Sequence, residues 1–321
     1  MKYNNIPKTS VKVSAISLGT MMFSNKTDEA ESLRILDFAY ENGINFWDTA
    51  NTYNNGGSEK IVGKALKGRR EDIVLATKVF GDMGGMNNKG LSRRNIMSAV
   101  DKSLMRLDTD YIDIYYMHAP DYETDIEESL DAMNQLVRNG KIRYVAVSNF
   151  ASWQVAEIMG ICEKRGYAKP VITQNVHNLL ARSIEPELVP CIKHYNIGLA
   201  IYNPVAAGIL AGKYTGREVI SGSRFDNNKM YQDRYWNEIN FNAVDSLIKM
   251  ADDYGMSLME LAMRWVFSND YVTSVISGVS RLEQLEENIK YVDLEPLSAD
   301  LLAKCDELWE EISGNRHKYN R

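Results

Sequence analysis

Short apolar runs alternate with amphipathic stretches along almost the whole chain. The short runs are rich in β-branched and apolar residues, as strands are, whereas the longer stretches carry apolar residues at helical spacing. Strands are expected at residues 16–18, 45–47, 73–77, 112–117, 144–147, 171–173, 199–202 and 275–276. Helices are expected at residues 28–41, 59–66, 93–107, 126–138, 153–164, 186–195, 237–254, 258–267, 282–291 and 299–312. This alternation predicts an α/β fold with a parallel sheet.

Eight successive strands, most of them followed by helices, predict closure into a (β/α)8 TIM barrel. The segment from Met1 to Val13 is expected to form an N-terminal hairpin at the barrel bottom, and extra helices are expected near the C-terminus. The competing open sheet would carry Gly-x-Gly-x-x-Gly between a strand and a helix, and the glycines between residues 81 and 90 lack that spacing. No linker divides the chain, so one domain over residues 1–321 is predicted. The polar, irregular stretch from Tyr214 to Trp236 is interpreted as a functional loop without core structure.

Composition and charge narrow the class of protein. Of 321 residues, 45% are hydrophobic and 25% are charged, as in ordinary globular proteins, and the formal net charge of −6 disfavours a nucleic-acid or anionic-membrane partner. Cys162, Cys191 and Cys305 lack motif spacing, which favours buried thiols in a reducing compartment. No signal-peptide core and no spanning apolar run is found, so we expect a cytoplasmic location. The histidines show no metal-ligand spacing, and no metal is expected.

Polar side chains stand where three of the predicted strands end. Asp48 ends the second strand and Tyr53 follows in its loop, while Lys78 and His118 end the third and fourth strands. Each alone has a structural interpretation, as a capping acid, a loop aromatic, a solvated strand end or a satisfied histidine. The active sites of barrel enzymes lie at the carboxyl ends of the strands, so the four together predict a catalytic site.

These four residue types suit the reduction of a carbonyl group. A free phenol has a pKa of about 10 and is a poor proton donor at neutral pH, and a nearby ammonium lowers that pKa. Asp48 would hold Lys78 beside Tyr53, and His118 would orient a carbonyl oxygen by a hydrogen bond. Tyr53 would then protonate the developing alkoxide. No side chain supplies a hydride, so a nicotinamide cofactor is predicted.

Several segments, in this order, resemble the aldo-keto reductase superfamily, and the resemblance extends from Gly19 to about Asn288. The matching segments are Asp48–Tyr53 (DTANTY), Gly57–Gly63 (GSEKIVG), Ala76–Lys78, Leu107–Asp121, Ser148–Phe150 and Gln174–Asn175. The resemblance implies a (β/α)8 barrel that reduces an aldehyde or ketone to an alcohol with NADPH. It also implies that Asp48, Tyr53, Lys78 and His118 form the catalytic tetrad. Residues 202–214, 223–225 and 234–236 look closest to branches that include bacterial enzymes and aflatoxin-aldehyde reductases.

The resemblance further implies a set of cofactor contacts. Tyr202 would stack on the nicotinamide, and its carboxamide would bind Ser148, Asn149 and Gln174. The rest of the cleft and the pyrophosphate would be lined by Gly19, Thr20, Met21, Asp48, Asn203, Pro204, Val205, Ala207, Gly208, Leu210, Lys213 and Arg224. The adenosine 2′-phosphate and adenine would contact Gly278, Ser280, Arg281, Gln284, Glu287 and Asn288. Ser280 is expected to be an N-cap beside free backbone N–H groups, with Arg281 adding a charged fork.

Two other functions and the substrate stay open at this point. The chain could be a non-catalytic nicotinamide-binding regulatory subunit, because potassium-channel β subunits resemble the same family. The other alternative is a Schiff-base enzyme, which needs a desolvated Lys78; pairing with Asp48 would keep that lysine charged and non-nucleophilic, which disfavours this function. A small carbonyl substrate is expected to contact Met22, Phe23, Tyr53, Phe80 and His118. Further candidates for the pocket wall are Met83, Met86, Phe225, Tyr231 and Trp236.

Overall fold

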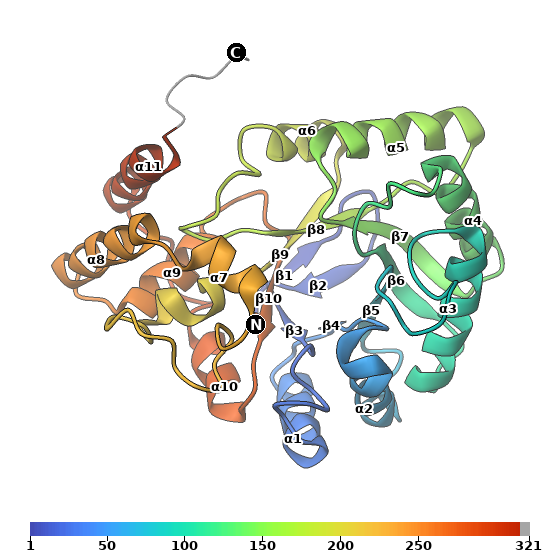
Figure 1. Cartoon of the computed structure of the whole chain (residues 1–321), viewed down its shortest axis with the longest axis horizontal. Helices are drawn as coiled ribbons and strands as arrows, with labels where there is room; N and C mark the ends of the chain where they lie inside the picture. Colours follow the sequence, from blue (N-terminus) through green and yellow to red (C-terminus); the bar gives the residue numbers. More distant parts are fainter. Residues whose placement is uncertain (315–321) are drawn as a thin grey trace. The chain divides into compact units, whose positions relative to one another are not determined.

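The strands follow the predicted order, and eight of them form a closed barrel (Figure 1). The structure is a computed structural model that describes residues 1–314. The barrel strands are β3 (Ile16–Gly19), β4 (Phe46–Asp48), β5 (Val74–Val79), β6 (Ile112–Met117), β7 (Ile142–Ser148), β8 (Ile172–Val176), β9 (Gly198–Tyr202) and β10 (Ser274–Gly278). They are ordered β10-β3-β4-β5-β6-β7-β8-β9, and registered neighbours such as β4 and β5 run parallel. The predicted (β/α)8 barrel is confirmed.

The chain divides into two compact units, which are described separately. The first unit, residues 1–175, 184–202 and 271–290, contains the barrel. Its helices are α1 (Glu29–Glu41), η1 (Tyr53–Gly56), α2 (Gly57–Leu66), α3 (Arg93–Leu107), α4 (Ile126–Arg138), α5 (Ser152–Arg165), α6 (Leu188–Tyr195) and α10 (Leu282–Lys290). The second unit, residues 176–183, 203–270 and the chain from 291 onward, contains η2 (Ala206–Ala211), α7 (Lys229–Tyr235), α8 (Glu238–Asp253), α9 (Leu258–Phe267) and α11 (Ala299–Ser313). The single domain over residues 1–321 stays a prediction.

Several helices begin where the sequence offers a capping side chain. Asp28, Asp125, Ser257 and Ser298 precede α1, α4, α9 and α11, and each side chain accepts a backbone N–H of the first turn. The first N–H groups of a helix have no partner inside the helix, so these acceptors stabilise its start. Within residues 1–314, none of the helices is long and apolar enough to cross a bilayer.

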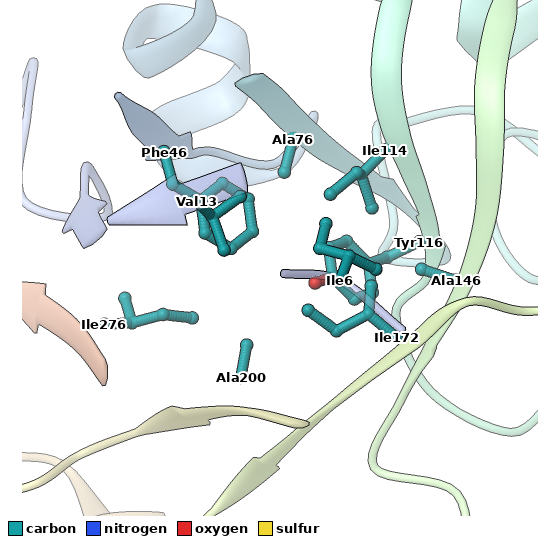
Figure 2. Close-up of a cluster of buried hydrophobic side chains, with 10 residues drawn as sticks. All are labelled: Ile6, Val13, Phe46, Ala76, Ile114, Tyr116, Ala146, Ile172, Ala200 and Ile276. Atoms are coloured by element: carbon teal, nitrogen blue, oxygen red, sulfur yellow. The ribbon is translucent and has the colours of Figure 1, made fainter. Parts of the chain in front are cut away.

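The predicted N-terminal hairpin is present, and it supplies part of the barrel interior. Strands β1 (Tyr3–Asn5) and β2 (Lys12–Ser14) pair antiparallel. Ile6 and Val13 are fully buried and belong to the same cluster as side chains of the barrel strands (Figure 2). The barrel members of the cluster are Phe46, Ala76, Ile114, Tyr116, Ala146, Ile172, Ala200 and Ile276. The hairpin therefore contributes apolar side chains that the barrel strands do not provide themselves.

The interpretation of residues 214–236 as a loop without core structure was wrong. The stretch contains helix α7, and its aromatic side chains pack together inside the second unit. Phe225 is fully buried, with its ring centroid 5.1 Å from that of Tyr214 and 4.9 Å from that of Trp236. Edge-to-face and tilted packing stabilises such a cluster. Polar residues separate these aromatics in the sequence, so no helical or strand period revealed them.

Replacing Ile6 by alanine should destabilise the first unit. The change removes three buried carbon atoms from the barrel interior, and losses of about 2–5 kcal/mol in the free energy of unfolding are usual for this substitution. Lys12→Ala, at an exposed position of the same hairpin, is the control and should change stability by about 0.5 kcal/mol or less. Urea unfolding followed by circular dichroism measures both, and equal values for the two variants would contradict the role given to the hairpin.

Candidate active site

A buried ion pair joins the neighbouring strands β4 and β5. Lys78 Nζ donates to Asp48 Oδ1 at 2.5 Å and to the carbonyl oxygen of Thr49 at 2.7 Å. The side chains of Lys78 and Asp48 are 0% and 3% exposed. Gln174 on β8 donates from Nε2 to the other carboxylate oxygen, Asp48 Oδ2, at 2.8 Å. Buried charges are tolerated when they are paired and hydrogen-bonded in this way.

Tyr53 and His118 lie beside this ion pair. Lys78 Nζ donates a third hydrogen bond to Tyr53 Oη at 3.3 Å, and it lies 4.8 Å from the centre of the tyrosine ring. The rings of Tyr53 and His118 meet edge to face, with their centroids 6.0 Å apart. The structure therefore brings together the four residues that the sequence places at or shortly after the ends of β4, β5 and β6.

The charge state of Lys78 argues against Schiff-base chemistry. Burial alone lowers the pKa of Lys78, but the charges and hydrogen bonds of Asp48 and Tyr53 outweigh burial and leave that pKa raised. All three N–H groups of the ammonium are in use. A lysine that forms a Schiff base must instead be neutral with its nitrogen lone pair available.

His118 is neutral at physiological pH. Burial, together with the positive charge of Lys78, lowers the pKa of His118 to about 3. A neutral imidazole has one N–H donor and one acceptor nitrogen. His118 can therefore donate a hydrogen bond to a ligand oxygen without carrying a charge into the site.

A left-handed turn, which was not predicted from the sequence, holds Tyr53 in place. Asn54, Asn55 and Gly56 follow Tyr53 with φ angles of 51°, 54° and 82°. Asn54 donates from Nδ2 to the carbonyl oxygens of Met21 at 3.0 Å and Phe23 at 2.5 Å. Asparagine and glycine are the residues that tolerate left-handed backbone best. The run Asn-Asn-Gly was therefore a readable signal for this turn.

The polar residues at the ends of β7, β8 and β9 form one hydrogen-bonded group. Asn149 donates from Nδ2 to the carbonyl oxygen of His118 at 2.9 Å and accepts from Tyr202 Oη at 2.8 Å. Ser148 Oγ donates to the carbonyl oxygen of Gln174 at 2.9 Å. The residues expected at the nicotinamide thus contact one another, and through Asn149 and Gln174 they contact the tetrad.

The end of β3 and the residues that follow it make contacts that stabilise the fold. A Cβ atom on Gly19 would lie 2.7 Å from Ile276 Cγ2, so close packing between β3 and β10 requires glycine there. The Thr20 hydroxyl is buried and donates to the carbonyl oxygen of Asp48 at 3.0 Å. Phe23 is fully buried, whereas Met22 and Phe80 are half-buried. Their contacts with cofactor or substrate stay predictions.

At the start of α10, Ser280 was expected to be an N-cap beside free backbone N–H groups. The structure shows a different arrangement. The Ser280 N–H donates to Gln284 Oε1 at 2.9 Å, and the Leu282 N–H donates to Glu31 Oε1 at 2.8 Å. Ser280 Oγ also donates to Gln284 Oε1, at 3.3 Å. That expectation was wrong because a carboxylate from another helix and an amide from α10 itself supply the acceptors. Arg281 is exposed and forms no ion pair within the described chain.

The two residues predicted to contact adenine, Glu287 and Asn288, lie further along α10. Asn288 donates from Nδ2 to Ser277 Oγ at 2.8 Å, and Glu287 is exposed. The Ser277 hydroxyl oxygen therefore anchors the Asn288 amide. The contacts of both residues with adenine stay predictions.

The remaining predicted cofactor residues belong to the second unit. Four residues between 203 and 208 have positive φ, namely Asn203 at 62°, Ala206 at 46°, Ala207 at 58° and Gly208 at 100°. Alanine in this conformation is strained, and such strain persists where surrounding structure imposes it. The buried Nδ2 of Asn203 has no hydrogen-bond partner among the described residues. Lys213 is exposed, and Arg224 donates to Tyr231 Oη at 3.0 Å.

Comparisons with known proteins agree with the resemblance seen in the sequence. The model of the aldo/keto reductase family matches residues 15–310. A probable voltage-gated potassium channel subunit beta of Arabidopsis thaliana is 39% identical over 304 residues, covering 92% of this chain and 93% of its own. Aflatoxin B1 aldehyde reductase member 2 of Mus musculus is 33% identical, covering 96% and 88%. The uncharacterized oxidoreductase YrpG of Bacillus subtilis is 34% identical, covering 98% of each chain.

The lowered pKa of His118 should make the protein less stable in acid. The unfolded chain binds a proton at His118 below pH about 6.5, but the folded chain binds it only near pH 3. Stability contributed by the neutral residue is therefore lost as the pH falls from about 6.5 towards 3. His118→Asn should reduce the slope of unfolding free energy against pH by up to one proton, measured by urea unfolding between pH 7 and 4. His194→Asn, which alters an exposed histidine, should leave the slope unchanged; equal slopes in all three proteins would contradict this assignment.

Proposed function

The chain belongs to the aldo-keto reductase family, and from that premise we propose that it reduces an aldehyde or ketone to an alcohol with NADPH as the cofactor. The observation that carries the proposal is the contact of one buried ammonium, Lys78, with both Asp48 and Tyr53. The proposed partner is a small carbonyl compound in the cytoplasm. A panel of carbonyl substrates that includes 4-nitrobenzaldehyde, with NADPH consumption followed by absorbance, tests the activity directly.

The residues present suit a nicotinamide nucleotide. Tyr202 and Asn149 lie within hydrogen-bond reach of one another, so a stacking ring and an amide that can bind a carboxamide stand side by side. Arg281 offers an exposed guanidinium suited to a phosphate. In the second unit, the buried and unpaired Asn203 Nδ2 is a donor that needs an acceptor. When bound, the cofactor supplies the hydride that no side chain can provide.

The four residues Asp48, Tyr53, Lys78 and His118 then deliver a proton to the carbonyl oxygen. Neutral His118 donates a hydrogen bond to the carbonyl oxygen and orients it. Tyr53 gives its phenolic proton to that oxygen as negative charge develops there. The ammonium of Lys78 favours loss of this proton, because positive charge beside a phenol stabilises the phenolate. Asp48 holds Lys78 in position and in its charged form.

A second function is favoured by one comparison. The 39% identity to a probable potassium channel subunit beta supports a regulatory subunit that binds the nucleotide and serves a partner protein. Both functions require nucleotide binding, but only the first requires rapid turnover through Tyr53. The two can therefore be separated by a variant that changes the phenol alone.

Tyr53→Phe should reduce carbonyl reduction by a factor of roughly 10² to 10⁴, the usual contribution of general acid catalysis. The change removes only the hydroxyl, so NADPH affinity should stay within about twofold of the wild type. Single-turnover hydride transfer with saturating cofactor is the measurement. Tyr122→Phe, at a tyrosine that is 84% exposed, is the matched control. Transfer by Tyr53→Phe at the wild-type rate would exclude Tyr53 as the proton donor.

Arg281→Ala should weaken NADPH binding and spare NADH. The variant removes a charged hydrogen bond to the 2′-phosphate, which is worth about 1.5–3 kcal/mol, or roughly 10- to 150-fold in Kd. Calorimetric titration with both nucleotides measures the effect. Lys290→Ala removes a positive charge from the other end of α10 and should change neither affinity substantially. Equal weakening of NADPH and NADH by Arg281→Ala would refute the assignment.

A further inference from the structure

The N-terminus of α10 is in contact with a carboxylate from a distant part of the chain. Glu31 on α1 accepts the Leu282 N–H at 2.8 Å, although the two residues are 251 positions apart. Just before α1, Thr27 Oγ1 donates to the carbonyl oxygen of Ser280 at 3.1 Å. The start of α1 is thus joined to the start of α10 by two hydrogen bonds, on either side of Arg281 in the sequence.

Glu31 occupies a position that favours negative charge. The first N–H groups of a helix point outward, and the helix dipole is positive at this end, so a carboxylate is stabilised there. The side chain of Glu31 is 22% exposed, and its other oxygen accepts from Arg34 at 2.8 Å. The Ser280 N–H is also engaged, with Gln284. Two N–H groups that a phosphate could use at this terminus are therefore already bound by the protein's own side chains.

We propose that Glu31 is a specificity-determining residue that weakens binding of the 2′-phosphate and so brings the affinities for NADPH and NADH closer together. This inference rests on the proposed function, which assigns the 2′-phosphate to Ser280 and Arg281. Arg281 attracts the phosphate, while Glu31, bound to the next residue along the backbone, opposes it. A phosphate monoester carries about −1.5 to −2 charges at neutral pH, and NADH lacks this group. Glu31 therefore lowers the affinity for NADPH and leaves the affinity for NADH unaffected.

The size of the effect follows from Coulomb's law near a protein surface. A unit like charge roughly 8 Å from the phosphate costs on the order of a threefold to thirtyfold change in Kd at an effective dielectric constant between that of water and about 20. Salt screens the interaction, so the effect should shrink as ionic strength rises. A purely structural contact between α1 and α10 would not give this dependence on salt and on the 2′-phosphate.

Glu31→Gln isolates the charge, because the amide oxygen can still accept the Leu282 N–H. The affinities to be measured on the whole protein are those for NADPH and NADH, and for the fragments adenosine 2′,5′-bisphosphate and 5′-AMP, by fluorescence and calorimetry. Glu31→Gln should bind NADPH and the bisphosphate roughly 3- to 30-fold more tightly than the wild type, with NADH and 5′-AMP unchanged. The gain should fall in 0.5 M NaCl. Glu29→Gln, an equal charge change on the same helix at a residue paired with Lys64, should have less than a twofold effect.

Three outcomes would overturn the inference. The first is no change in NADPH affinity in Glu31→Gln, and the second is an equal change for NADPH and NADH. The third is the same gain in Glu29→Gln, which would indicate net charge alone. If the wild type binds no nicotinamide nucleotide, the proposed function itself fails, and the inference fails with it. If the wild type binds NADPH and Arg281→Ala weakens only NADPH, the proposed cofactor site stands whatever Glu31→Gln shows.

Discussion

The burial of one lysine ammonium controls how the candidate site is arranged. Lys78 is completely enclosed, and an uncompensated charge in that position would cost several kcal/mol. Asp48, the Thr49 carbonyl and the Tyr53 hydroxyl supply the compensation. Each of these groups is therefore constrained to one position by the same requirement. Removing either charged partner would leave the other buried and unpaired, which is more costly than losing a single hydrogen bond.

Strands and loops contribute differently to the tetrad. Asp48 and Lys78 lie on neighbouring parallel strands, whose pairing sets their separation. Tyr53 lies in a loop, and its position depends on the left-handed turn that follows it and on the two hydrogen bonds of Asn54. Active sites commonly combine a rigid scaffold with residues carried on loops. Here the loop residue is the proposed proton donor, so the turn is as relevant to the chemistry as the ion pair.

The proposed nucleotide site places a group that attracts the 2′-phosphate and a group that repels it within a few residues of each other. Arg281 is exposed at the start of α10, and the carboxylate of Glu31 is held at the neighbouring backbone N–H. Specificity is a difference between two affinities, and a repulsive group can set it as effectively as an attractive one. The relatives differ in their names, from a channel subunit to an aldehyde reductase. Family membership therefore indicates the shared barrel, whereas the choice of ligand depends on local contacts of this kind.

The sequence by itself indicated the order of the barrel strands and, to within a few residues, the bounds of most strands and helices, because hydrophobic period and capping residues act over a few positions. It also indicated the tetrad, because the carboxyl ends of parallel barrel strands meet at one face. It did not indicate helix α7. Only the tertiary structure decided which side chains pair across long separations. Gln174 binds Asp48 across 126 positions and Glu31 binds Leu282 across 251. The aromatic cluster around Phe225 was hidden for the same reason, since its members share no local period and meet only through the folded path of the chain.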